Sequence, residues 1–186
     1  AQPWAIYTTA TTGFPYFYNG TSYTSSVALT LNAWNHVAVS RSAGTLKIFV
    51  NGVQGYSAAN TSNLTSGAIR IGGTSAGSDF EGYISNVRII NGTGLYTTAF
   101  TPPTAPLTAV TNTALLTCQS NRFIDNSSNA FSVTVSGTPS IQRFSPFITT
   151  NAYSTSVIGG SGYFDGTGDY LLTASNAAFT LAGDFT

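Results

Sequence analysis

Short runs of alternating apolar and polar residues, separated by glycine-containing turns, constrain the fold of this chain more than any other feature. Residues 34–41 alternate, Ser42-Ala43-Gly44 follows as a turn, and residues 46–50 alternate again before Asn51-Gly52. Successive side chains of a strand point to opposite faces, so this pattern predicts a β-hairpin. No segment of ten or more residues keeps the 3.6-residue period of an amphipathic helix. The sequence therefore predicts an all-β chain.

The same pattern recurs along the chain with turn residues between the runs. A spacing of roughly 8–12 residues between strands is typical of β-sandwiches and jelly rolls. We therefore expect an antiparallel jelly-roll β-sandwich. Further strands are expected within 16–18, 27–31, 68–71, 80–90, 133–135, 141–144, 163–164 and 170–173.

Charged residues are unusually rare, and their scarcity excludes several classes of partner. The chain has 6 Lys and Arg and 6 Asp and Glu among 186 residues, whereas about 25% of an ordinary domain is charged. A surface this neutral cannot bind nucleic acid by neutralising phosphates. No stretch approaches the roughly 20 apolar residues of a membrane-spanning helix, so we expect no membrane insertion. The 22 Ser, 29 Thr and 14 Asn favour strands and turns over helix interiors.

Five stretches together resemble one known family. Residues 34–52 resemble the central hairpin of laminin-G-like, concanavalin A-like lectin/glucanase jelly-roll domains, and residues 80–89 resemble their late strand. Residues 163–171 resemble the opening strand of that family, and residues 183–186 resemble the start of its next strand. Residues 115–129 resemble a connector that accompanies these domains in repetitive tail-fibre and virion-surface proteins of marine phages. The resemblance implies the jelly-roll fold and a location on a virion surface or outside the cell.

The order of these stretches differs from the order in the family, because the opening strand comes last. We therefore expect a window cut from a tandem repeat. Residues 1–100 would be the C-terminal part of one jelly roll, residues 101–158 a Pro-containing linker with connector strands, and residues 159–186 the opening strands of the next. The alternative is a complete chain whose tail strands complete a neighbouring subunit by strand addition. In both cases the partners are copies of the chain or neighbouring repeats.

Catalysis is not expected, because the carboxylates are few and scattered. Glycosidases use two carboxylates roughly 5–10 Å apart. Asp79 and Glu81 would share a strand face, but Glu81 is the only Glu and lies in a structural strand of the family motif. His36, the single histidine, is expected to be satisfied by backbone or solvent. Cys118, the single cysteine, is expected to be a buried, inert thiol.

A tyrosine-rich hairpin is the candidate binding site. Tyr16, Tyr18 and Tyr23 lie with Asn19 around its tip. Aromatic faces combined with amide and hydroxyl partners suit sugar rings, which stack on the aromatic ring and donate or accept hydrogen bonds at their edges. The same residues also suit cross-strand packing, so the residues alone leave both interpretations open.

One glycine-rich turn is the candidate metal site. Asp165 and Asp169 bracket Gly166-Thr167-Gly168, and oxygen ligands on such a loop would form a weak calcium site. The alternative is a turn in which the Asp side chains cap the local backbone. No other cofactor is expected.

Two functions follow from these observations. The first is a structural repeat module of a virion fibre, appendage or extracellular filament, assembled by sheet-edge and lateral packing, since neutral surfaces do not repel one another. The second is a lectin-like adhesion module that recognises glycans on a host surface.

Overall fold

The structure is a computed structural model that describes residues 4–9, 12–74, 77–147 and 160–186. These residues form fourteen strands and a single 3₁₀ turn, Ala177–Phe179. Eight of the strand pairings that they make are antiparallel. The prediction of an all-β, antiparallel fold is confirmed.

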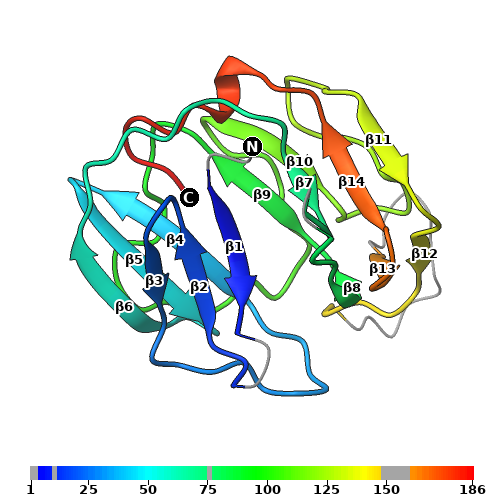
Figure 1. The fold of residues 1–186 in the computed structure, drawn as a ribbon, viewed down its shortest axis with the longest axis horizontal. Helices are drawn as coiled ribbons and strands as arrows, with labels where there is room; N and C mark the ends of the chain where they lie inside the picture. The colour runs from blue at the N-terminus through cyan, green and yellow to red at the C-terminus, as the bar shows by residue number, and fades with distance from the viewer. Residues whose placement is uncertain (1–3, 10–11, 75–76, 148–159) are drawn as a thin grey trace. The chain divides into compact units, whose positions relative to one another are not determined.

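The chain divides into two compact units, each built from separate stretches of sequence (Figure 1). The β1–β6 unit contains residues 2–66, 90–102 and 177–186. The β7–β14 unit contains residues 67–89 and 103–176. Each unit therefore depends on pairing between residues that are distant in sequence.

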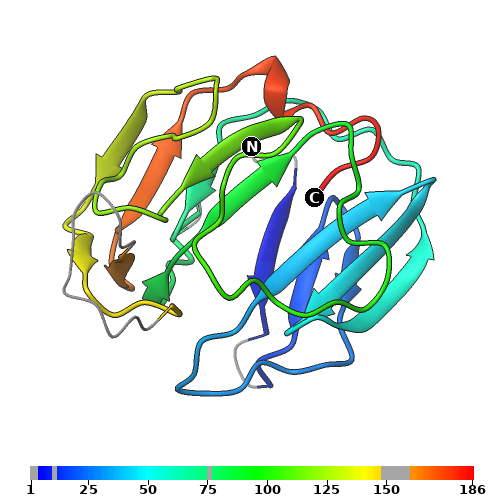
Figure 2. The same cartoon turned by 180° about the vertical axis from the view of Figure 1, so that it is seen from behind.

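The β1–β6 unit contains two three-stranded sheets, seen from behind in Figure 2. The predicted hairpin at residues 34–50 is confirmed, and Ala43 and Gly44 form its turn with φ values of 48° and 73°. Positive φ at both central residues matches the right-handed twist of the flanking strands. The two sheets consist of β1 (Ala5–Thr8), β2 (Pro15–Tyr18) and β3 (Ser22–Thr24), and of β4 (Val37–Ser42), β5 (Thr45–Val50) and β6 (Val53–Ala59).

Buried apolar residues of these strands form the core of the β1–β6 unit. Leu46, Ile48 and Phe49 are fully buried on β5, and Phe17 of β2 is 1% exposed. The C-terminal segment, residues 177–186, adds further fully buried side chains to this core. Burying such a side chain stabilises the fold by about 1.5–3 kcal/mol.

The β7–β14 unit contains smaller sheets around a separate core. Phe164, Leu171 and Cys118 are the buried centre of this core. The sheets run in the orders β11-β14-β7, β12-β13-β8 and β10-β9, and the last residue of β9 falls in the β1–β6 unit. The strands are β7 (Arg70–Ile71), β8 (Glu81–Ile84), β9 (Val87–Ile90), β10 (Thr113–Thr117), β11 (Val133–Ser136), β12 (Ser140–Gln142), β13 (Ser161–Asp165) and β14 (Tyr170–Thr173).

The strand expected at residues 27–31 is absent, and that prediction is wrong. The Ser25 hydroxyl accepts a hydrogen bond from the Val27 backbone N–H and donates one to the Val27 carbonyl. This local bonding replaces a ladder with a turn. Leu31 is 81% exposed, so this stretch lacks a buried apolar face.

The strand expected at residues 80–90 is divided into β8 and β9. Asn86 lies between them with a φ of 57°, which a regular strand cannot accommodate. Its side-chain oxygen accepts a hydrogen bond from the Leu107 backbone N–H, and its own backbone N–H donates to the Cys118 carbonyl. These bonds fix the break in the strand.

The C-terminal strands pair with earlier strands of the same chain. Phe164 of β13 lies opposite Gly82 of β8, and Leu171 of β14 lies opposite Ile71 of β7. The boundaries 1–100, 101–158 and 159–186, and the tandem array from which they follow, stay predictions.

Asp125 holds the loop after β10 against that strand. Its carboxylate is 7% exposed and accepts four hydrogen bonds. The donors are the backbone N–H groups of Leu116, Ser127 and Phe131 and the Ser127 hydroxyl, at 2.8–3.0 Å. A buried carboxylate is tolerated only with such complete satisfaction.

Replacing Asp125 should therefore destabilise the protein. We expect Asp125→Ala to lower the free energy of unfolding by about 3 kcal/mol, because it leaves buried N–H groups without acceptors. Urea unfolding followed by tryptophan fluorescence would measure the change. Asp165→Ala removes an exposed carboxylate that accepts one bond, from Thr167, and is the matched control. Equal losses in the two variants would contradict the role of Asp125.

Candidate functional site

The register of the β1–β2–β3 sheet places three tyrosines on one face. Tyr7 lies opposite Tyr16, and Tyr16 lies opposite Thr24. Tyr18 lies opposite Ala5 on one side and Ser22 on the other. Directly opposed residues of antiparallel strands share a face. We call Tyr7, Tyr16 and Tyr18 the tyrosine face.

The three phenol rings of the tyrosine face lie close together at the surface. The Tyr7 and Tyr16 ring centroids are 5.4 Å apart, and Tyr18 is 42% exposed. Partial burial raises the pKa of Tyr7, and the neighbouring Tyr16 and Tyr18 raise that pKa further. The face therefore combines apolar ring surface with phenol groups, and the hydroxyl residues Ser22 and Thr24 lie beside it.

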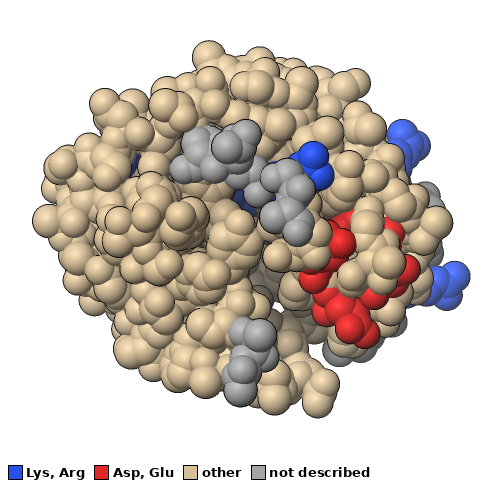
Figure 3. Space-filling model, in the orientation of Figure 1, with Lys and Arg blue, Asp and Glu red and all other residues tan. Residues whose placement is uncertain are grey.

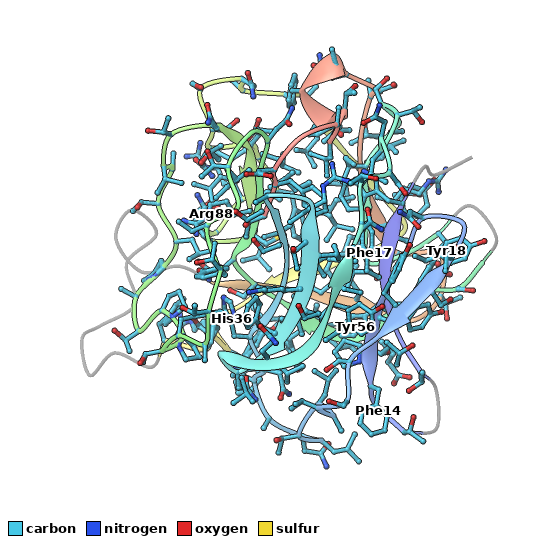
Figure 4. All side chains as sticks on the ribbon, turned by 90° about the vertical axis from the view of Figure 1, so that its left-hand side faces the viewer. Phe14, Phe17, Tyr18, His36, Tyr56 and Arg88 are labelled. Carbon is cyan, nitrogen blue, oxygen red and sulfur yellow. The ribbon has the colours of Figure 1, made fainter. Side chains whose placement is uncertain are left out.

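Tyr23 lies on the opposite face of the same sheet. It is paired with Phe17, and their ring centroids are 6.3 Å apart. Its ring also meets that of Tyr56 at 5.8 Å. In Figure 4, Phe17 lies on the inner side of β2 and Tyr18 on its outer side. The structure thus brings Tyr16 and Tyr18 together and directs Tyr23 into the packing between sheets.

Asn19 follows Tyr18 at the hairpin turn. Its backbone N–H donates to the Thr21 carbonyl at 3.3 Å. Its side-chain Nδ2 is shielded from solvent and has no acceptor among the described residues. Asn19 therefore does not present its amide nitrogen on the accessible part of the tyrosine face.

Tyr7 is a member of this face that the sequence analysis missed. It is far from the hairpin tip and joins the other tyrosines only through the β1–β2 register. The available signal was the run of Ile6, Tyr7 and Thr8, which are residue types enriched in strands.

The two candidate calcium ligands bind backbone N–H groups. Asp165 Oδ1 accepts from the Thr167 N–H at 2.7 Å. Asp169 is 1% exposed and accepts from the N–H groups of Thr138 at 2.5 Å and Asp165 at 3.2 Å. The bonds from Thr167 and Asp165 are local and match the capped turn that the sequence analysis weighed against a metal site, whereas the bond from Thr138 joins the turn to a distant loop. Within the described part of the chain, no group of three or more His, Cys, Asp or Glu is arranged to hold a metal ion.

Acidic side chains gather on one surface of the β7–β14 unit (Figure 3). Glu81 of β8 lies directly opposite Asp165 of β13, and Asp79 Oδ2 accepts from the Gly168 N–H. The sequence analysis did not bring Glu81 and Asp165 together, because only the long-range pairing does so. Both side chains are exposed.

Exposed aromatic residues lie next to this acidic pair. Tyr83 and Tyr163 are directly opposed, with ring centroids 5.1 Å apart. The ring of Phe144, which is 53% exposed, lies 4.9 Å from that of Tyr83. The β7–β14 unit therefore carries its own aromatic surface, which provides an internal control for experiments on the tyrosine face.

Cys118 and His36 lie in packed environments. Cys118 is 1% exposed, and burial raises the pKa of its thiol to about 12. The expected burial of the Cys118 thiol is confirmed. Its lack of reactivity stays a prediction. The His36 ring meets the rings of Tyr96 and Phe100 edge-on at 5.8 and 5.4 Å. Cys118 is therefore buried in the interior, whereas His36 is half-buried.

Comparison with known families assigns the chain to a superfamily. A laminin-G family model, described as the concanavalin A-like lectin/glucanases superfamily, matches residues 1–94, half of the chain. The chain belongs to the concanavalin A-like lectin/glucanase superfamily. No curated protein and no solved structure matches it.

The match with the concanavalin A-like superfamily covers the whole tyrosine face and extends through β9. The predicted sandwich class is therefore confirmed at the level of the superfamily. Among the described residues, no helix is both long and apolar enough to cross a membrane.

The raised pKa of Tyr7 predicts a pH dependence. Below pH 10, the ordinary pKa of tyrosine, Tyr7 is neutral in both the folded and unfolded states. As the pH rises above 10, the unfolded chain ionises first, so stability falls until the raised folded pKa is passed. We expect Tyr7→Phe to reduce this alkaline loss when the free energy of unfolding is measured against pH. Identical pH profiles for the variant and the wild type would contradict this prediction.

Proposed function

We propose that this chain is a non-catalytic carbohydrate-binding module that recognises a glycan through its tyrosine face. The observation that carries the proposal is the alignment of Tyr7, Tyr16 and Tyr18 on one surface of the β1–β2–β3 sheet. Membership of a superfamily named for lectins and glucanases supports it.

The chemistry of the face suits a pyranose ring. A sugar ring has apolar C–H groups on its faces and hydroxyls at its edges, so it stacks on aromatic rings and bonds to polar groups beside them. The three phenols supply both ring surface and hydroxyl groups. Ser22 and Thr24 add short hydroxyl side chains at the flanks. A surface built from strands is rigid, which lowers the entropic cost of binding.

Substitution on the face should weaken glycan binding. We expect Tyr18→Ala to reduce affinity about tenfold, equivalent to about 1.4 kcal/mol, because it removes the most exposed stacking ring. A glycan array would identify the ligand, and isothermal titration calorimetry would measure the loss.

Tyr83→Ala is the matched control for this experiment. Tyr83 is 41% exposed, close to the 42% of Tyr18, but lies in the other unit. The control should bind the glycan as the wild type does. Loss of binding in the control with full binding by Tyr18→Ala would contradict a site on the tyrosine face.

We propose as a second function a structural repeat of a virion fibre or extracellular filament. The observation that favours it is β11, the edge strand of the β11-β14-β7 sheet. Its sequence is Val-Thr-Val-Ser, and Val135 is 46% exposed. Edge strands normally carry Lys, Pro or a bulge that prevents pairing with another chain.

Lateral pairing through β11 would join copies of this nearly uncharged module. A glycan-binding face on such a fibre would serve adhesion, so the two functions are compatible.

A charge placed on β11 should block lateral assembly. We expect Val135→Lys to remove filaments seen by negative-stain electron microscopy and to reduce light scattering at high protein concentration. The reason is that an edge lysine disfavours pairing of strand edges. Val110→Lys places the same charge at a site that is 40% exposed and outside any strand, and should leave assembly intact. Unchanged filaments in Val135→Lys would argue against this edge.

A further inference from the structure

The C-terminal segment, residues 177–186, occupies a slot between two other parts of the β1–β6 unit. On one side, Phe185 exchanges backbone hydrogen bonds with Arg41 of β4, at 2.9 and 3.1 Å. On the other side, Thr186 exchanges them with Ile90, and the Gly92 N–H donates to the Asp184 carbonyl. The segment is therefore bonded along both of its edges, as a central strand is.

Three apolar side chains anchor the segment. Phe179, Leu181 and Phe185 are 0, 2 and 3% exposed. The Phe185 ring centroid lies 6.1 Å from that of Phe17 on β2. The Leu181 carbonyl accepts from the Leu64 N–H at 3.5 Å. Backbone pairing combined with buried alternate anchors is the mode by which extended peptides bind to sheets.

Arg41 provides the polar part of the slot. Its side chain is 2% exposed, and its guanidinium lies 5.0 Å from the centre of the Phe185 ring. It donates to the Leu181 carbonyl at 2.9 Å and, through Nε and a terminal nitrogen, to the Gly183 carbonyl at 3.0 and 2.6 Å. Removing the segment would leave the buried Arg41 guanidinium without these three hydrogen bonds, which costs free energy. The slot is therefore more stable when a segment is bound in it.

The segment is joined to the rest of the chain through an exposed connection. Residues 174–176 are exposed and belong to no strand. The boundary between the two units falls between Asn176 and Ala177. The contacts described above all lie within the β1–β6 unit, while the connection leads to β14 of the other unit. The bonds that hold the segment therefore do not depend on which copy of the chain supplies it.

We propose that this slot is a strand-acceptor site that takes residues 177–186 from a second copy of the chain. Exchange of an identical segment preserves its contacts, so it costs little free energy at equilibrium. In dilute solution, residues 177–186 bind to the slot of their own chain, because the short connection gives them an effective concentration of about 1 mM there. Exchange between copies therefore becomes substantial as the protein concentration approaches that value. This proposal is independent of glycan binding and of pairing through β11.

A cross-linking experiment on the full chain tests the exchange. Ser40 Oγ and Thr186 Oγ1 are 2.9 Å apart in the filled slot, so cysteines at these positions can form a disulfide. We would prepare Ser40→Cys and Thr186→Cys as separate chains, mix them under reducing conditions near 1 mM, and oxidise the mixture. The expected product is a covalent heterodimer whose 40–186 linkage is identified by mass spectrometry.

Two controls determine how the result is interpreted. The chain that carries both substitutions should close its disulfide internally, which verifies the geometry of the slot. Adding Phe185→Ala to the Thr186→Cys chain should lower the yield of heterodimer about tenfold, because it removes a buried anchor. Internal closure of the double variant without any heterodimer in the concentrated mixture would overturn the proposal.

A second measurement does not depend on disulfide geometry. Deleting Ser175 and Asn176 shortens the connection, so the segment should no longer reach the slot of its own chain. Light scattering coupled to size-exclusion chromatography should then report a dimer. A monomer would overturn the proposal.

Discussion

A buried cation satisfied by carbonyl oxygens is the constraint on which the β1–β6 unit depends. The Arg41 guanidinium is inside the protein, where an unpaired charge would cost several kcal/mol. Its partners are the Leu181, Gly183 and Ser62 carbonyls and the Asn60 side chain, which come from two stretches that are distant in sequence. These residues must be positioned together to satisfy it, so Arg41 specifies where the C-terminal segment lies.

Local features of the fold could be predicted from the sequence. The β4–β5 hairpin is determined by alternation on both sides of Ala43-Gly44, all within a few residues. The wrong prediction at residues 27–31 arose because the hydrogen bonds made by the Ser25 hydroxyl compete with strand pairing, and alternation does not reveal them. The division of residues 80–90 depends on Asn86, whose side chain is held by a distant loop.

The candidate site was only partly predictable, because part of it depends on pairing between strands that are distant in sequence. Tyr16 and Tyr18 alternate within one strand, so their shared face follows from residue spacing. Tyr7 joins them through pairing with a separate strand, and pairing with Phe17 directs Tyr23 to the other face. The opposition of Glu81 and Asp165 depends on residues more than 80 positions apart. Spacing along one strand is readable in a sequence, whereas the register between distant strands is set by the whole fold.

The construction of the β1–β6 unit from three stretches of chain has a consequence for biosynthesis. Residues 2–66 leave the ribosome first, but the slot beside Arg41 stays unfilled until residues 177–186 emerge. During that interval, which lasts several seconds at about 5–20 residues per second, the nascent chain exposes unpaired strand edges. The high sequence separation of these contacts also predicts slow folding. A nascent chain whose slot is still unfilled can then accept residues 177–186 from a neighbouring chain in which that segment has already been synthesised.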